Sequence, residues 1–130
     1  MEKLVQRLSL HGYVNFTGNL VSAQKFIRYH RVYVHAARME NCCLVLAEAM
    51  ACGKPVFAAP VGGIPELFND GVEGFYWNLN NPADAAMRVI KVVEDHQLYM
   101  RMSKAARKRY EMHFKPEVVG PVLLKAVMGS

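Results

Sequence analysis

The feature that most constrains the fold of this chain is its alternation of short apolar runs with longer segments of helical periodicity. Runs typical of strands cover residues 14–17, 32–36, 55–59 and 74–77. Helical patterns cover residues 2–10, 22–29, 42–52 and 65–69, and the chain beyond Pro82 is also predicted to be helical. Strands separated by helices pair in parallel through right-handed crossovers. The sequence therefore predicts an α/β fold with a parallel sheet flanked by helices.

Local signals mark several helix boundaries. Gly12 and Gly53 are expected C-caps, and Asn81 before Pro82 is an expected N-cap. After that cap, the apolar stripe consists of Ala86, Met87, Ile90 and Val93. The next helix has one face with an apolar residue at every fourth position: Leu98, Met102, Ala106, Tyr110 and Phe114. A Lys-Pro pair at residues 115–116 breaks this helix before a last short helical segment.

Length and composition indicate a single globular domain over residues 1–130. A chain of this size buries about 65% of its unfolded surface, which is enough for one core. Its composition is 52% hydrophobic and 21% charged, which is typical of a soluble protein. No apolar stretch reaches the ~18 residues that a bilayer span needs, and no signal-peptide pattern follows Met1. We therefore expect a cytoplasmic protein without a membrane span.

The cysteines and the basic residues limit the chemistry further. Cys42, Cys43 and Cys52 lack the even count of a secreted disulfide framework and the paired spacing of a zinc site, so we expect reduced core residues. The net charge is +5, and the densest basic segment holds Arg101, Lys104, Arg107, Lys108 and Arg109. A solvated helix face explains this segment better than a nucleic-acid surface, which usually brings interleaved aromatic residues or a recognisable module.

Ligands of open parallel sheets bind beyond the carboxyl ends of the strands, where three loops hold unusual residues. These loops are Gly18, Asn19, Leu20 and Val21; residues 37–41; and residues 60–63. If the helix after the second loop begins near Asn41 or Cys42, its first backbone amides have no intrahelical partners. These amides belong to Asn41, Cys42, Cys43 and Leu44. Together with the helix dipole they favour a bound phosphate.

Glu48 is the one charged residue of an otherwise apolar helix, and Glu40 lies eight positions before it. A helix that is apolar on all sides is normally buried, and a buried carboxylate must be paired or hydrogen-bonded. Glu48 is either a structural acid satisfied by Arg, Lys, Tyr or a backbone donor, or a cleft residue that accepts hydrogen bonds from ligand hydroxyls. Glu40 is either an acid that stabilises the helix dipole or a ligand contact. Spacing alone does not separate these alternatives.

Several motifs in order resemble the carboxy-terminal half of a GT-B glycosyltransferase, specifically the large retaining family 4 among the glycosyl transferases group 1. Glu40 and Glu48 match the E-x7-E signature of that family. The segments VYVHAA, LAEAMACGKPV, GGIPE and DGVEGF agree with its pattern, as do F-x-G at residues 16–18 and AARKRYEMHF near the end. The resemblance implies a Rossmann-like sheet that forms an incomplete GT-B carboxy-terminal domain.

The resemblance also implies a site for a nucleotide-diphosphate sugar. Glu40 would be the catalytic residue, in contact with the donor sugar, and Glu48 would bind the ribose. The amides of Asn41, Cys42, Cys43 and Leu44 would hold the diphosphate or the sugar, and Gly18, Asn19, Leu20 and Val21 would lie against the base. No D-x-D sequence occurs, which fits a transferase without a metal or cofactor.

Three further residues have less specific expectations. Gly62 and Gly63 are expected to shape a tight turn, and Glu66 is expected to be an exposed or structural acid. His35 is either a cleft residue or a satisfied core histidine.

The chain also departs from the family pattern. Cys42 and Cys43 stand where the family often has Phe followed by Gly or Pro, and Ala37 stands where it often has Ser. The family's two opening strands, with their basic pair, and its whole amino-terminal domain have no counterpart. The chain is therefore expected to be about the last third of an enzyme. In the family's strand order, 3-2-1-4-5-6, either the remaining strands close up or another chain fills the gap.

An uncovered edge of a buried parallel sheet favours association, so we expect a homodimer or a complementing partner chain. Two function hypotheses follow. The chain is a donor-binding domain that transfers a sugar when completed by its missing part, or it is a non-catalytic remnant that binds nucleotide sugar or serves in assembly. The sequence does not indicate the base, the sugar or the acceptor.

Overall fold

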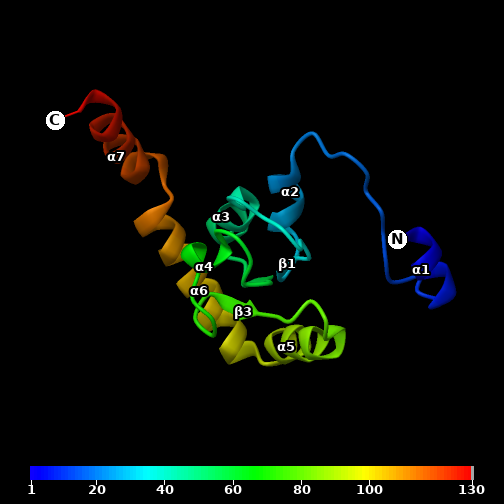
Figure 1. The fold of residues 1–130 in the computed structure, drawn as a ribbon. Coiled ribbons are helices and arrows are strands. Elements are labelled where there is room, and N and C mark those ends of the chain that lie inside the picture. Colours follow the sequence, from blue (N-terminus) through cyan, green and yellow to red (C-terminus); the bar gives the residue numbers. More distant parts are fainter. Residues whose placement is uncertain (130) are drawn as a thin grey trace.

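A computed structural model describes residues 1–129 and confirms the predicted α/β fold. Its sheet has three parallel strands in the order β1-β2-β3, namely β1 (Tyr33–His35), β2 (Val56–Ala58) and β3 (Gly74–Tyr76). Helices α3 (Leu44–Ala51) and α4 (Ile64–Leu67) connect successive strands, and α5 (Pro82–Glu94) and α6 (His96–His113) follow them. Figure 1 shows these helices gathered around the small sheet.

The sheet divides the core into two layers, because successive side chains of a strand point to opposite faces. The larger layer includes Val56 and Ala58 of β2 with buried residues of α3, α4 and α6: Leu46, Ala49, Met50, Ile64, Leu67 and Ala106. The other layer joins Phe57 of β2 to Val92, Leu98 and Met102. The predicted face of α6 is confirmed, since Leu98, Met102 and Ala106 are buried and Tyr110 and Phe114 pack against the core.

Helix α6 also holds the carboxyl end of α3. Gly53 follows this end in a left-handed conformation with φ of 64°, as expected of the C-cap glycine. Ser103 Oγ donates to the Gly53 carbonyl at 2.6 Å, and Arg107 donates to the carbonyl of Ala51. The last carbonyls of a helix have no intrahelical partners, so α6 supplies donors where α3 lacks them.

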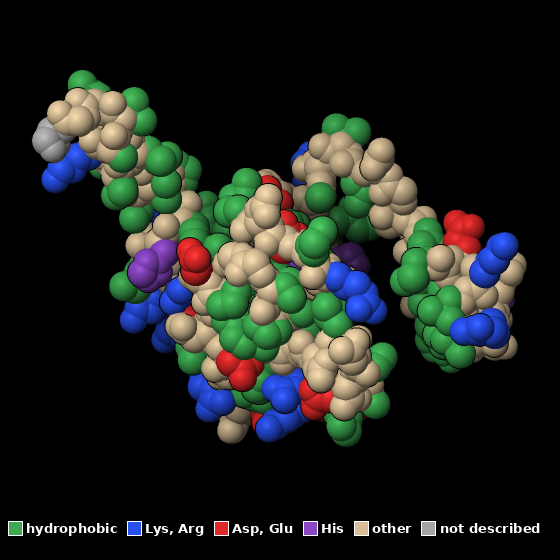
Figure 2. Space-filling model, in the orientation of Figure 1, with side chains coloured by type: hydrophobic (Ala, Val, Ile, Leu, Met, Phe, Trp, Pro, Cys, Tyr) green, Lys and Arg blue, Asp and Glu red, His purple; other side chains and the backbone are tan. Residues whose placement is uncertain are grey.

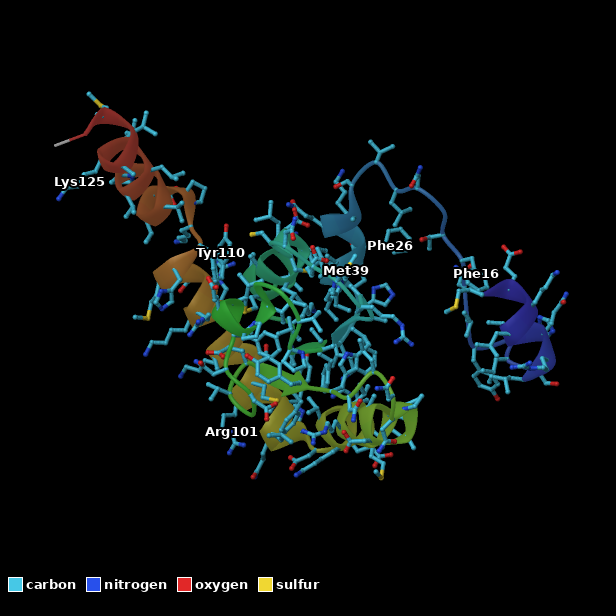
Figure 3. The ribbon with its side chains drawn as sticks, viewed as in Figure 1. Phe16, Phe26, Met39, Arg101, Tyr110 and Lys125 are labelled. Carbon is cyan, nitrogen blue, oxygen red and sulfur yellow. The ribbon has the colours of Figure 1, made fainter. Side chains whose placement is uncertain are left out.

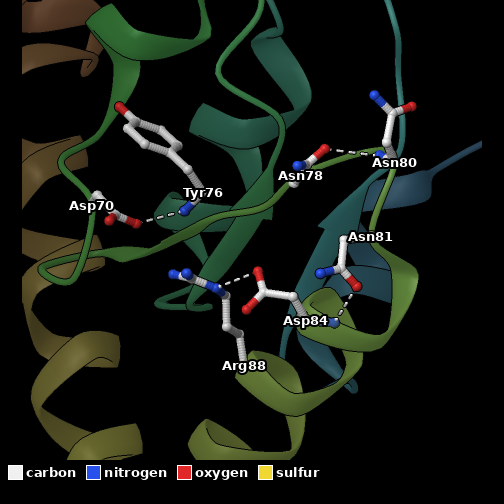
Figure 4. Close-up of polar contacts among 7 residues, drawn as sticks. All are labelled: Asp70, Tyr76, Asn78, Asn80, Asn81, Asp84 and Arg88. Carbon is white, nitrogen blue, oxygen red and sulfur yellow. Dashed lines mark hydrogen bonds and ion pairs between the residues drawn. The ribbon is translucent and has the colours of Figure 1, made fainter.

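Short-range polar contacts order the chain between α4 and α5 (Figure 4). Asp70 Oδ1 accepts a hydrogen bond from the Tyr76 amide at 2.6 Å. Asn81 Oδ1 accepts one from the Asp84 amide at 3.2 Å, which confirms the predicted N-cap of α5. One turn further, Arg88 Nε lies 2.8 Å from Asp84 Oδ2.

The packing face predicted for α5 is wrong. Ala85 and Val92 are buried and Val89 packs beside them, whereas Met87 and Ile90 of the predicted stripe are 63% and 51% exposed. Both sets of apolar residues recur at helical spacing, so periodicity alone fits either of them. The position of the sheet decides which set is buried.

The amino-terminal region also differs from the prediction. Helix α1 (Glu2–Arg7) ends before Ser9, whose φ is 56°, and does not continue to Gly12. Residues 14–17 form no strand. This segment runs outward from the sheet and connects α1 to α2 (Ala23–Arg28), so the remaining strands have not closed up around it (Figure 1). A strand requires a hydrogen-bonded neighbour, and among residues 1–129 no strand lies beside this segment.

Helix α7 (Pro116–Met128) is longer than the predicted short segment and projects from the body of the molecule (Figure 1). None of its residues is buried, and its exposed apolar residues are Val118, Val122, Leu123, Leu124, Val127 and Met128. Figure 2 shows hydrophobic side chains on the visible surface of this helix. Within residues 1–129, no helix has both the length and the apolar character needed to cross a membrane.

Candidate functional site

Two of the three predicted loops, residues 37–41 and 60–63, meet beyond the carboxyl ends of β1 and β2. The turn of Gly62 and Gly63 lies directly against the loop that follows β1. A Cβ atom on Gly62 would lie 1.6 Å from the carbonyl oxygen of Glu40, and one on Gly63 would lie 2.4 Å from that of Asn41. Gly62 also has a left-handed φ of 55°. The prediction of a tight turn is therefore confirmed, and this turn fixes the backbone at Glu40.

Glu40 contacts a histidine on the same side of the sheet. His35 is the last residue of β1, and its Nε2 lies 3.0 Å from Glu40 Oε2. The Tyr33 ring stacks on the His35 ring with 6.3 Å between centroids. His35 is therefore a hydrogen-bonded, mostly buried residue that orients Glu40. Met39, labelled in Figure 3, is 88% exposed, so this loop also reaches the surface.

Helix α3 begins later than predicted. It starts at Leu44, with Cys43 as the N-cap, and not at Asn41 or Cys42. A start near Asn41 would require its carbonyl to accept a bond from the Val45 amide. That carbonyl lies against Gly63 and makes no such bond.

The later start changes which amides are free to hold an anion. The Leu44 amide donates to the Cys42 carbonyl at 3.0 Å, so it is not one of the free donors. Within residues 1–129, the amides of Asn41, Cys42 and Cys43 have no backbone partner and stay available. Burial raises the pKa of the Cys43 thiol, the Leu46 amide partly offsets this rise, and the Glu40 carboxylate adds to it.

Glu48 lines a cavity of about 780 Å³ between α2, α3 and the junction of α6 with α7. Gln24 Nε2 donates to Glu48 Oε1 at 3.3 Å, in place of the Arg, Lys, Tyr or backbone donor considered above. Helix α3 is not buried on all sides as predicted, because Leu44 is 68% exposed. A carboxylate with one long hydrogen bond in an open cavity keeps acceptor capacity for a ligand.

Both glutamates lie close enough to Tyr33 to affect the pKa of its hydroxyl. Burial raises the pKa of the Tyr33 hydroxyl above its usual 10.0, and the charges of Cys43, Glu48 and Glu40 raise it further. Tyr33 and His35 are two residues apart on β1 and therefore share a face of the strand. The two glutamates thus lie on the α3 side of the sheet, within electrostatic reach of the same tyrosine.

The third predicted loop does not join this arrangement. Gly18, Asn19, Leu20 and Val21 are all exposed, and they belong to the extended segment before α2. Ser22 and Gln24, just beyond that loop, line the cavity beside Glu48 instead. Glu66, at the short helix after the glycine turn, is exposed as expected.

Sequence reasoning missed the basic residues of the cavity, which are Lys25, Arg28, Arg107 and Lys115. Lys25 and Arg28 are three residues apart on α2, a spacing that places both on one helix face. That spacing is visible in the sequence, whereas Arg107, which is predicted to lie on a solvated face, reaches the same cavity from α6. Two acids, Glu48 and Glu117, also line the cavity, so these four cations leave it with a net positive charge, which suits a ligand with phosphate groups.

Comparisons with known proteins show which family this chain resembles. The family model described as "Glycosyl transferases group 1" matches residues 1–109. The chain is 29% identical over 117 residues to N-acetyl-alpha-D-glucosaminyl L-malate synthase of Bacillus anthracis, covering 90% of this chain and 31% of that protein. It is 34% identical over 113 residues to D-inositol 3-phosphate glycosyltransferase of Streptomyces avermitilis, covering 85% of this chain and 24% of that protein.

Two solved structures have a similar fold over nearly the whole chain. HepE of Anabaena in complex with UDP is similar with a TM-score of 0.93 and 25% identity, over 99% of this chain and 36% of HepE. Sucrose-phosphate synthase of Thermosynechococcus elongatus is similar with a TM-score of 0.81 and 27% identity, over 99% of this chain and 34% of the synthase. The chain thus spans about a third or less of the length of each of these proteins.

Proposed function

The chain belongs to the glycosyl transferases group 1 family, and from this premise we propose that it is the donor-binding domain of a GT-B glycosyltransferase. It would bind a nucleotide-diphosphate sugar and, together with an acceptor-binding part, transfer the sugar with retention of configuration. The relatives named above are a synthase and a glycosyltransferase, which favours a transferase over a non-catalytic module.

One observation carries this proposal. Glu40 contacts His35, and both Glu40 and Glu48 lie near Tyr33 on the same face of β1. The glycine turn holds the backbone of Glu40, and Glu48 is open to a cavity. Similar structures of HepE were determined with UDP and with UDP-glucose, the second at a TM-score of 0.90 and 26% identity. A uridine nucleotide is therefore the first donor to test.

Different residues would contact different parts of the donor. Glu40, oriented by His35, would accept hydrogen bonds from the sugar hydroxyls beside the reacting carbon. The amides of Asn41, Cys42 and Cys43 would hold the diphosphate or the sugar at the positive end of α3. Glu48 would accept the ribose hydroxyls. Such preformed donors can balance the leaving diphosphate without a metal ion.

Isothermal titration calorimetry with UDP, UDP-glucose, GDP-mannose and ADP-glucose tests this proposal. We expect at least one nucleotide to bind, and Glu48→Ala to weaken its binding by about 10- to 100-fold, since charge-assisted hydrogen bonds contribute ~1.5–3 kcal/mol. Glu66→Ala is the matched control, because Glu66 is an exposed acid outside the cavity.

Two results would contradict the proposal in different ways. If none of the four nucleotides binds to the folded chain, the donor site is refuted. If a nucleotide binds equally well to wild type and Glu48→Ala, the donor site stands but the ribose role of Glu48 is wrong.

A further inference from the structure

Three side chains of different chemistry converge at the start of α3. His35, Glu40 and Cys43 each offer one ligand atom, and these atoms all lie within 4.8 Å of one another. Of these atoms, His35 Nε2 and Glu40 Oε2 are 3.0 Å apart. Within residues 1–129, no other group of three such side chains lies so close together.

The combination of nitrogen, oxygen and sulfur identifies the class of ion that would bind. Imidazole, carboxylate and thiolate are the protein ligands of zinc, with bonds of about 2.0–2.3 Å. Tetrahedral coordination at those lengths places ligand atoms about 3.4–3.7 Å apart. The distance of 3.0 Å between His35 Nε2 and Glu40 Oε2 lies just below this range, and the other two pairs lie within 4.8 Å. Small side-chain adjustments would therefore complete the coordination. Mg²⁺ prefers oxygen ligands in an octahedron, which this set does not provide.

Each ligand is held by the fold before any ion binds. His35 belongs to β1 and stacks on Tyr33. The glycine turn blocks movement of the Glu40 backbone, and the side chain of Cys43 is buried beside the first turn of α3. Preformed ligands lose little conformational entropy on binding, which favours coordination.

We propose that His35 Nε2, a Glu40 carboxylate oxygen and Cys43 Sγ form a binding site for Zn²⁺ and related thiophilic divalent ions. The thiol proton is released to solvent as the Cys43 sulfur binds the ion. The hydrogen that His35 Nε2 donates to Glu40 is given up as well, and the neutral imidazole then carries its hydrogen on Nδ1. Three protein ligands leave a fourth position, on the side where Glu40 is 25% exposed, for water. The ion has no part in sugar transfer.

Occupation of this site has a functional consequence. The ion engages the carboxylate of Glu40, which is the group that would contact the donor sugar, so Zn²⁺ should weaken donor binding. This consequence rests on the proposed function, whereas the metal site itself does not.

A Co²⁺ titration followed by optical absorption tests the site directly, because a Co²⁺–thiolate bond gives a charge-transfer band. We expect the band in the wild type, its loss on addition of about one equivalent of Zn²⁺, and no effect of excess Mg²⁺. Cys43→Ser should abolish the band. Cys42→Ser is the matched control, because the neighbouring Cys42 is exposed and outside the cluster, and this variant should keep the band.

Because Cys43 is buried, Cys43→Ser could lose the band by misfolding, and a second variant separates this effect from loss of the metal site. His35→Gln should keep the circular-dichroism spectrum of the wild type and lower the Co²⁺ affinity at least about tenfold. The proposal is overturned if the wild type gives no band, if the band survives Cys43→Ser, or if His35→Gln binds Co²⁺ as tightly as the wild type. These readouts do not involve a sugar nucleotide, so they stand or fall separately from the proposed function.

Discussion

At the scale of single residues, the position of Glu40 depends on two glycines that are distant in sequence. The turn of Gly62 and Gly63 lies so close to the β1–α3 loop that neither position has space for a Cβ atom. The same contact holds the Asn41 carbonyl and delays the start of α3 to Leu44. The glycine turn therefore positions the first glutamate of the E-x7-E pair.

Gly62→Ala is expected to destabilise the protein by at least ~2 kcal/mol, because the new Cβ meets backbone and the φ of 55° is left-handed. Urea unfolding followed by circular dichroism measures this change. Gly12→Ala is the control, since a Cβ there has no atom within 4 Å, and it should alter the free energy of unfolding by less than ~1 kcal/mol. Equal effects of the two substitutions would show that the turn does not constrain Glu40.

At the scale of elements, α6 stabilises the carboxyl ends of two shorter helices. Besides the contacts of Ser103 and Arg107 with the end of α3, Arg109 donates to the carbonyls of Leu67 at 3.0 Å and Glu66 at 3.1 Å, at the end of α4. A cation at a helix carboxyl end also interacts favourably with the helix dipole. The basic segment of α6 is therefore only partly a solvated face.

Arg109→Met is expected to lower the free energy of unfolding by about 1–2 kcal/mol, because it removes two donors from carbonyls of α4. Arg101→Met has the same change in charge at an exposed position of the same helix, and it should have an effect below ~0.5 kcal/mol. Chemical denaturation of the two variants at one ionic strength makes the comparison. Indistinguishable unfolding midpoints would rule out the capping role of Arg109.

At the scale of the whole molecule, β1 is an edge strand of the sheet, and one of its faces is partly uncovered. Val34 is 41% exposed, although its neighbour in the register, Phe57 of β2, is fully buried. The segment before α2 runs outward from the sheet (Figure 1) and exposes Phe16, Leu20 and Val21. Parallel strands are normally covered on both faces, so this edge favours association with another chain.

We expect the chain to self-associate at concentrations of tens of micromolar, as sedimentation velocity would show. Val34→Lys places a charge on the β1 edge and should shift the distribution towards monomer, because charged edge strands resist pairing. Val72→Lys changes an exposed valine in the turn before β3 and should not. A folded wild-type monomer across this concentration range would contradict the expectation.

Most of the helices and strands could be predicted from residues that are close together in the sequence. Periodicity and capping depend on residues that are close in the chain. They predict the parallel sheet, the Asn81 cap, the glycine that follows α3 and the packing face of α6. The resemblance that singled out Glu40 and Glu48 also rests on local motifs. The family match agrees with it.

Contacts between distant parts of the chain select among alternatives that fit the local sequence equally well. The elements that pack against each segment decide three features: the buried stripe of α5, the open environment of Glu48 and the lack of a strand at residues 14–17. The convergence of His35, Glu40 and Cys43 likewise depends on the turn that folds the β1–α3 loop. Whether a side chain is buried, and what it contacts, depends on residues that are far away in the sequence but close in space. A local sequence pattern does not contain the distances between such residues.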